Sequence, residues 1–115
     1  MSDRGTPPRI KAGLWVKMAL RMADLDGRSG AVLRRGDPDA GGVLAVLRGR
    51  NGLTVLSQLR TSDGELAWMR ATGPLPVDEA ATDAYVARQV GFDPDLWVLE
   101  FDAPDLLPPF EAKIL

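Results

Sequence analysis

The densest cluster of hydrophobic positions lies near the N-terminus, in residues 9–25. Apolar side chains recur there at intervals of three and four, the spacing of one face of an α-helix, and a second apolar row lies beside the first. The two rows are Ile10, Leu14, Met18, Met22 and Leu25, and then Val16, Leu20 and Ala23. The pattern predicts a helix that ends at Gly27, and a helix this apolar is expected to be buried by more than one neighbour.

Shorter apolar runs with the character of β-strands follow. Asn51-Gly52 and Asp63-Gly64 predict tight hairpin turns, because Asn and Gly accept a positive φ. Residues 53–60 alternate between apolar and polar side chains, whereas residues 43–48 are apolar on both faces and are therefore expected at the centre of a sheet. The strands are predicted over residues 31–35, 43–48, 53–60 and 66–71.

The second half of the chain supplies one more helix and one more strand. Asp78 or Glu79 is expected to begin a helix that ends at Gly91, and residues 96–101 read as a strand. The order helix, four strands, helix, strand predicts an α+β two-layer sandwich. In this fold a mostly antiparallel sheet of about five strands carries both helices on one face.

A single domain is expected, since 115 residues fit one hydrophobic core. Residues 1–8 are polar with a Pro pair and are predicted to be a flexible tail, followed by one α+β domain over residues 9–101. Residues 102–115 form an acidic, Pro-rich C-terminal extension that nevertheless ends in apolar side chains. This extension is expected to lie over the sheet or along a neighbouring chain.

The composition narrows the chemistry. The chain has no cysteine and no histidine, which removes disulfides, thiolate zinc sites and the commonest general base. The sequence therefore predicts no cofactor and no catalytic residue, and it favours a protein that is not an enzyme. No uncharged run approaches the roughly 18 residues of a membrane span, so we expect no membrane partner and a cytoplasmic location.

The segment Arg34–Gly42 is the first candidate ligand site. Arg34 or Arg35 is suited to clamp a phosphate or carboxylate, and Asp37 and Asp39 are close enough in sequence to reach one cation. Alternatively the segment is an ordinary turn in which Asp37 bonds local backbone amides, and this interpretation is favoured. No phosphate-binding loop motif is present, because the required Gly-Lys-Ser/Thr order is missing.

Asp93-Pro94-Asp95 repeats the Asp37-Pro38-Asp39 pattern. If the two loops met at one edge of the sheet, Asp37, Asp39, Asp93 and Asp95 would make a weak candidate for a divalent-metal site. Two Asp-Pro turns at unrelated edges are the favoured alternative. Nucleic-acid binding is the least favoured function, although the first half of the chain is basic and Arg48, Arg50, Arg60 and Arg70 fall near predicted strand ends.

Apolar side chains outside the expected core suggest an interface. Trp68 is either a core residue, which is favoured, or part of an exposed patch, and Ile114 and Leu115 end the chain. The leading hypothesis is a non-enzymatic module that binds a protein partner, most simply as a homodimer. The alternative is a phosphate- or metal-dependent ligand binder or enzyme that uses the Arg34–Gly42 loop.

Four segments together resemble a known family. They are RIKAGLWV at residues 9–16, RRGDPDAG at 34–41, AYVARQ at 84–89 and DPDLWVLE at 93–100. In this order they resemble the alphaproteobacterial family called domain of unknown function 1491. The resemblance covers most of residues 9–101, leaves residues 102–115 outside it, and implies a small bacterial intracellular protein without an assigned activity. It therefore carries over no catalytic residue.

Overall fold

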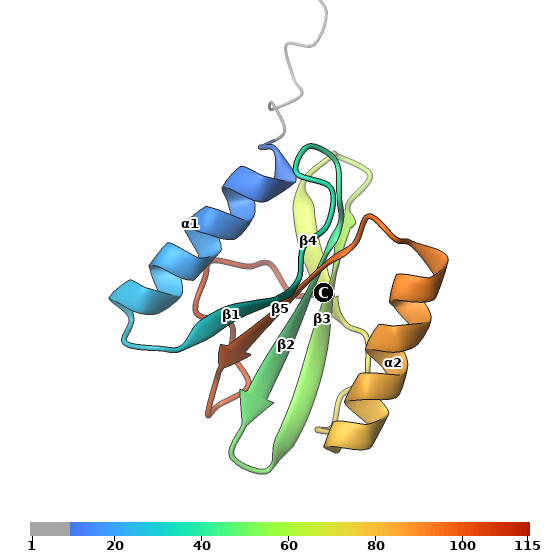
Figure 1. Ribbon diagram of the computed structural model, residues 1–115. Helices are drawn as coiled ribbons and strands as arrows, with labels where there is room; N and C mark the ends of the chain where they lie inside the picture. The colour runs from blue at the N-terminus through green and yellow to red at the C-terminus, as the bar shows by residue number, and fades with distance from the viewer. Residues whose placement is uncertain (1–9) are drawn as a thin grey trace, which may run out of the picture.

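A five-stranded sheet carries one helix on each of its two faces in the computed structural model (Figure 1). The structure describes residues 10–115, so the tail predicted over residues 1–8 lies outside the described residues. The elements in chain order are α1 (Ala12–Leu25), β1 (Gly30–Arg34), β2 (Val43–Gly49), β3 (Gly52–Arg60), β4 (Leu66–Arg70), α2 (Glu79–Phe92) and β5 (Trp97–Asp102). The predicted α+β class and the predicted order of elements are confirmed.

The strands lie side by side in the order β1-β5-β2-β3-β4. Every neighbouring pair is antiparallel except β2 and β5, which are parallel. The predicted hairpins are present, with Gly52 at φ 136° and Gly64 at φ 81°, values that only glycine adopts at little cost. The predicted start of the second helix is also confirmed, because Asp78 Oδ1 accepts a hydrogen bond from Ala81 N at 2.8 Å.

The apolar residues of β2 determine how the layers are arranged. Val43–Leu47 are each at most 2% exposed, which confirms the central place expected for this strand. Side chains alternate along a strand, so Val43, Ala45 and Leu47 face α1 while Leu44 and Val46 face α2. A strand that is apolar on both faces needs cover on both faces. The expectation of two helices on one face of a two-layer sandwich was therefore wrong, and α1 and α2 lie on opposite faces (Figure 1).

The C-terminal segment, residues 102–115, packs against the face that α1 covers. Ala103 and Phe110 are buried in the core beneath α1. The last residues then run beside β4, where Trp68 N donates to Lys113 O at 2.9 Å and Leu115 N donates to Trp68 O at 2.8 Å. The outer edge of β4 is thus covered by the chain's own end. Within residues 10–115, neither helix is long and apolar enough to cross a membrane.

Candidate functional site

Asp37 organises the loop between β1 and β2 from its centre. Its Oδ2 accepts hydrogen bonds from the backbone N of Asp39 at 3.1 Å and of Ala40 at 2.8 Å. Its backbone O accepts from Gly41 N at 3.1 Å and from the indole Nε1 of Trp97 at 2.8 Å. This carboxylate is therefore engaged in the turn, as the favoured interpretation of the sequence proposed.

The two Asp-Pro loops lie against each other through their backbones. Asp37 N donates to Asp95 O at 2.9 Å, and a Cβ placed on Gly36 or Gly41 would overlap this same oxygen and the ring of Trp97. Glycine is needed at both positions for this close approach of the two loops. The sequence interpretation explained these glycines by the turn alone and did not predict the contact with a second loop. The expectation that the two turns lie at unrelated edges was wrong.

The carboxylates nevertheless do not converge. Asp93 Oδ1 accepts from Asp95 N at 3.1 Å within its own turn, and Asp39 Oδ1 lies 3.7 Å from Lys11 Nζ at the surface. Across residues 10–115, no three acidic side chains gather where they could hold a metal ion. Asp37, Asp39, Asp93 and Asp95 thus share a neighbourhood without forming a set of metal ligands.

The two arginines of the loop also diverge. Arg34 Nη1 donates to the backbone O of Arg35 at 3.2 Å. The Arg35 guanidinium carbon lies 5.3 Å from the centre of the Trp97 ring, a cation–π contact on the face of the sheet beneath α1. This geometry does not direct both guanidiniums at one anion.

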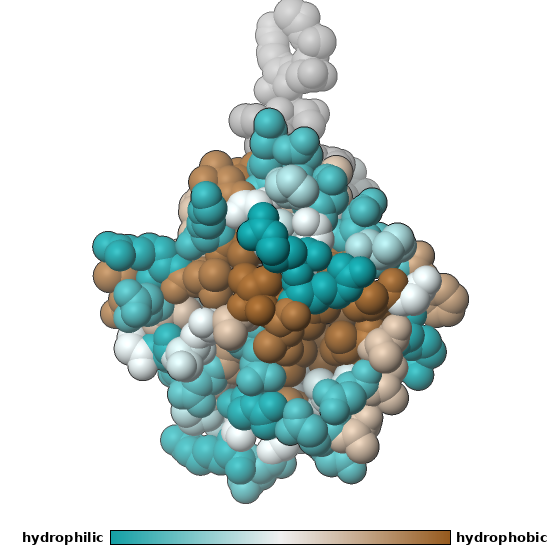
Figure 2. All heavy atoms as spheres, viewed as in Figure 1, coloured by the Kyte–Doolittle hydropathy of each residue, from teal (hydrophilic) through white to brown (hydrophobic). Residues whose placement is uncertain are grey.

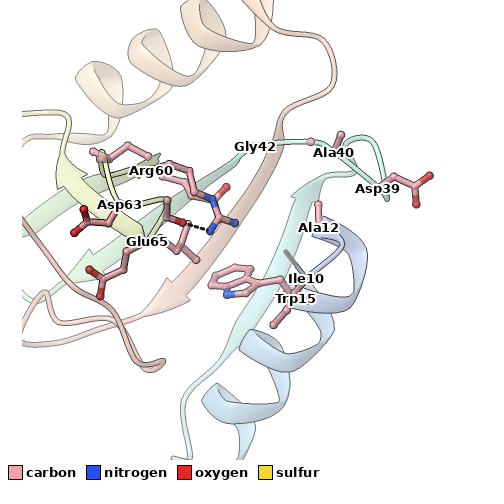
Figure 3. Close-up of a pocket in the computed structure, with 14 residues that line it drawn as sticks. Ile10, Ala12, Trp15, Asp39, Ala40, Gly42, Arg60, Asp63 and Glu65 are labelled. Carbon is pink, nitrogen blue, oxygen red and sulfur yellow. Dashed lines mark hydrogen bonds between the residues drawn. The ribbon is translucent and has the colours of Figure 1, made fainter. Parts of the chain in front are cut away.

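A cavity of about 510 Å³ opens between the start of α1, the end of the same loop and the β3–β4 hairpin (Figure 3). Trp15 projects into it from α1 and Arg60 from the hairpin, whereas the Asp39 carboxylate points away from it (Figure 3). Arg60 Nη1 donates to Gly64 O at 3.0 Å. The cavity therefore has an aromatic wall and one guanidinium, which already has a backbone acceptor.

A charged cluster that the sequence did not reveal ties α2 to the sheet. Arg48 Nη1 and Nη2 donate to the two carboxylate oxygens of Glu79 at 2.9 and 3.0 Å, and its Nε and Nη2 reach Glu100 at 3.3 and 3.2 Å. Hydrogen bonds from Arg48 lower the pKa of Glu79, and the bonds to Glu79 and Glu100 raise the pKa of Arg48. Arg48 is one of the four arginines near predicted strand ends that the least favoured hypothesis, nucleic-acid binding, would use, and it is instead paired with two carboxylates.

Comparison with known proteins assigns the chain to a family. The sequence model of the family DUF1491, described as "protein of unknown function", matches residues 10–111. The chain belongs to the DUF1491 family. The crystal structure of a DUF1491 protein from Caulobacter crescentus is 31% identical, with a TM-score of 0.82 over 93% of this chain and 100% of that chain. No curated protein matches this sequence.

Two further solved structures share the DUF1491 fold. An NMR structure of a DUF1491 protein from C. crescentus is 30% identical, with a TM-score of 0.82 over 95% of this chain and 99% of that one. A protein from A. tumefaciens, at 22% identity, has a TM-score of 0.77 over 91% of this chain and 95% of that one, and supports the fold alone. The resemblance noted in the sequence is confirmed, and the family match extends into the C-terminal segment.

In this DUF1491 protein, Trp68 and Ile114 face inward. Trp68 is 1% exposed, and its ring centre lies 5.3 Å from those of both Trp15 and Phe110, so it offers no surface to a partner. Ile114 packs against the same core, and of the three residues proposed for an interface only Leu115 is fully exposed, at 64%.

Most of the exposed large apolar side chains of this DUF1491 protein lie instead at the start of the described chain, on α1 and β1. The helix buries its row of small residues, which lets it lie close to the sheet. That row is Ala12, Val16, Ala19 and Ala23. Ile10 and the apolar row of α1 that begins at Leu14 face outward, whereas Trp15 and Leu20 pack against the core. Val32 and Leu33 of β1 are also exposed. The outward residues are Ile10, Leu14, Met18, Met22 and Leu25, 44–71% exposed.

Proposed function

We propose that the protein is a non-enzymatic module that acts by binding protein, and that its first partner is a second copy of itself. The observation that carries the proposal is the apolar surface of α1 and β1. Seven of the twelve exposed large apolar side chains of the described residues lie in residues 10–33, and exposed apolar surface that is gathered in one region typically marks an interaction site. Figure 2 shows hydrophobic surface gathered across the middle of the view, where Figure 1 places β1 and its neighbouring strands between the two helices.

The polar groups first considered for chemistry support the same proposal. Asp37 is bonded within its turn, Arg48 is paired with two carboxylates, and Arg70 Nη1 donates to Leu106 O at 3.3 Å. These groups stabilise the fold, so they are poorly placed to act on a substrate. By contrast, burial of the exposed α1 and β1 side chains would stabilise a complex by roughly 25 cal/mol per Å² of apolar surface before the costs of association.

Sedimentation velocity of the full chain across the micromolar range tests the proposal. The expected result is a dimer whose fraction rises with protein concentration. A monomer at every concentration would contradict self-association. A cytoplasmic location is part of the proposal, and cell fractionation checks it.

A second candidate is a ligand site for phosphate or a divalent metal at the Arg34–Gly42 loop. One observation favours it: the end of this loop lines the 510 Å³ cavity, a volume in the range of small-molecule pockets. Melting temperature measured against magnesium, manganese or inorganic phosphate tests it, because a ligand that binds only the folded state must raise stability. No change with any of the three removes this candidate.

A further inference from the structure

We infer that the second copy adds to the sheet at β1 as an antiparallel strand, so that one continuous sheet runs through the dimer. This inference rests on the proposed self-association and names where and how the two copies meet. It follows from three properties of β1, which are an uncovered edge, a fixed hydrogen-bonding register and opposite charges at the two ends of the strand.

One edge of the sheet is covered by the chain itself and the other is open. The outer edge of β4 is bonded to the C-terminal segment through Trp68, as described above. Along β1, Gly30–Leu33 are all exposed, and within residues 10–115 β5 is the only strand bonded to β1. An open edge with apolar side chains is a ready template for another strand.

The register of β1 against β5 decides which backbone groups face outward. Asp102 N donates to Ser29 O at 2.9 Å, and Ala31 lies opposite Glu100. Because bonding directions alternate in an antiparallel pair, Ser29 and Ala31 point their N–H and C=O groups at β5, while Gly30 and Val32 point theirs at the open edge. The register shifts after Val32, which ends this regular stretch.

This pattern is complementary to itself. Two copies of β1 that run antiparallel about Ala31 place Gly30 of each copy opposite Val32 of the other. The outward N–H and C=O groups then meet in matched pairs on both sides of the two-fold axis, as an isologous interface requires. Ala31 lies opposite Ala31 of the second copy as a pair without direct hydrogen bonds, at a Cα separation of about 4.5 Å.

Charge selects the antiparallel direction. Arg34 is the last residue of β1, and Arg35 follows it. At its N-terminal end, acidic side chains surround Arg28 and raise the pKa of Arg28, chiefly through its hydrogen bond with Asp26 and also through attraction from Asp105 and Asp102. Antiparallel pairing about Ala31 places Arg34 of one copy opposite Arg28 of the other. The acidic neighbours of Arg28, which are Asp26, Asp102 and Asp105, outnumber it and leave that end net negative, whereas parallel pairing would bring two basic ends together.

The decisive experiment uses a single cysteine, because the natural chain has none. Ala31→Cys places two thiols across the two-fold axis, at a separation a disulfide accepts. Under mild oxidation we expect a covalent dimer in high yield. Met18→Cys on the outer face of α1 and Asp63→Cys in the β3–β4 turn are the matched controls, and both are expected to cross-link slowly.

A second variant tests the backbone bonds directly. Val32→Pro removes an N–H that the monomer does not use in its own sheet, so an edge strand tolerates it. We expect the dimer to weaken about tenfold or more, because one donor is lost from each copy. Val32→Thr retains the N–H and is expected to dimerise like the natural chain. Circular dichroism and melting temperature check that each variant is folded.

The outcomes separate the inference from the proposed function. A natural chain that dimerises, with Met18→Cys cross-linking faster than Ala31→Cys, places the seam on α1 and overturns the pairing at β1 while self-association stands. A folded Val32→Pro variant that dimerises unchanged overturns it as well. A natural chain that stays monomeric and an Ala31→Cys variant that does not cross-link contradict both, and the open edge would then suit a strand from another protein.

Discussion

Replacement of Phe110 by Ala tests whether the C-terminal segment belongs to the cooperative fold. Phe110 is 7% exposed, and its ring centre lies 5.1 Å from that of Trp15, 5.3 Å from Trp68 and 5.5 Å from Phe101. Truncation of a buried Phe to Ala typically costs about 3–5 kcal/mol. Because the C-terminal segment can partly relax into the space, we expect the lower end, about 3 kcal/mol.

A loss of this size is large against a total stability of about 5–15 kcal/mol for a domain. At about 4 °C per kcal/mol it lowers the melting temperature by about 12 °C. Urea unfolding followed by tryptophan fluorescence measures it, since Trp15 and Trp68 contact the deleted ring. Leu107→Ala is the control, because Leu107 lies in the same segment but is 53% exposed and should cost less than about 0.5 kcal/mol.

The reasoning fails if Phe110→Ala costs less than about 1 kcal/mol, no more than its control. Such a result would mean that residues 102–115 detach before the domain unfolds, so that Phe110 contributes nothing to the global transition. Covering of the β4 edge would then be transient, and the contrast between the two edges of the sheet would weaken.

Three further predictions concern the charged cluster and the glycines. Arg48→Met should destabilise the protein by only about 0.5–1 kcal/mol in urea unfolding, because the Arg48 side chain is 42% exposed and water screens the pairing. The pKa of Glu79 is lowered on folding, so its contribution is present above the pKa of the unfolded chain and is lost as pH falls through the pKa of the folded one; urea unfolding should therefore show the stabilities of the natural chain and Glu79→Gln converging as the pH falls from neutral into the acidic range. Gly36→Ala should cost about 1–3 kcal/mol, because its Cβ would overlap Asp95 O, whereas Gly91→Ala in α2 has open space and should be neutral or stabilising by up to about 1 kcal/mol; thermal melts of the two variants check this contrast.

Local chemistry made much of the fold predictable. The hairpins near Asn51-Gly52 and Asp63-Gly64 and the cap at Asp78 depend on residues within a few positions of one another, and all three are present. The positive φ that was expected of both residues in each turn is found at Gly52 and Gly64 and not at Asn51 or Asp63, and Gly52 pairs with Gly49 as the first residue of β3. The central place of β2 was also predictable, because Val43–Leu47 are apolar on both faces. The same observation already required a covering layer on each side, although the helices were assigned to one face.

The buried face of α1 could not be read from hydrophobicity. Two apolar rows compete on this helix, and the row with the larger side chains, which includes Leu14 and Met18, faces outward. Ala19 and Ala23 face the sheet, since small side chains allow the helix to lie close and to complete a densely packed core. Selection between the rows depends on the shape of the sheet, which the sequence pattern of the helix does not contain.

The arrangement of the loops could not be predicted either, because it depends on the order of the strands in the sheet. Asp37 and Asp95 are neighbours only because β5 inserts between β1 and β2, so that the loop leading into β5 meets the loop that joins β1 to β2. The Arg48–Glu79–Glu100 cluster has the same origin, since it joins β2, α2 and β5. A meander of consecutive strands, as the sequence order implied, would have produced neither contact.

The insertion of β5 also explains why β1 is the open edge. If the sheet ended at β2, this strand would be its edge, although Val43–Leu47 of β2 are all buried. β5 covers that edge and is itself covered by β1, in which Gly30–Leu33 are exposed. The topology thus places at the edge the strand with the least buried apolar surface. The only charged residue of β1 is Arg34 at its end, and its centre carries no charge. Edge strands that must remain unpaired usually place charges there, so the apolar centre of β1, between a basic and an acidic end, is better explained by a strand that pairs with its own copy.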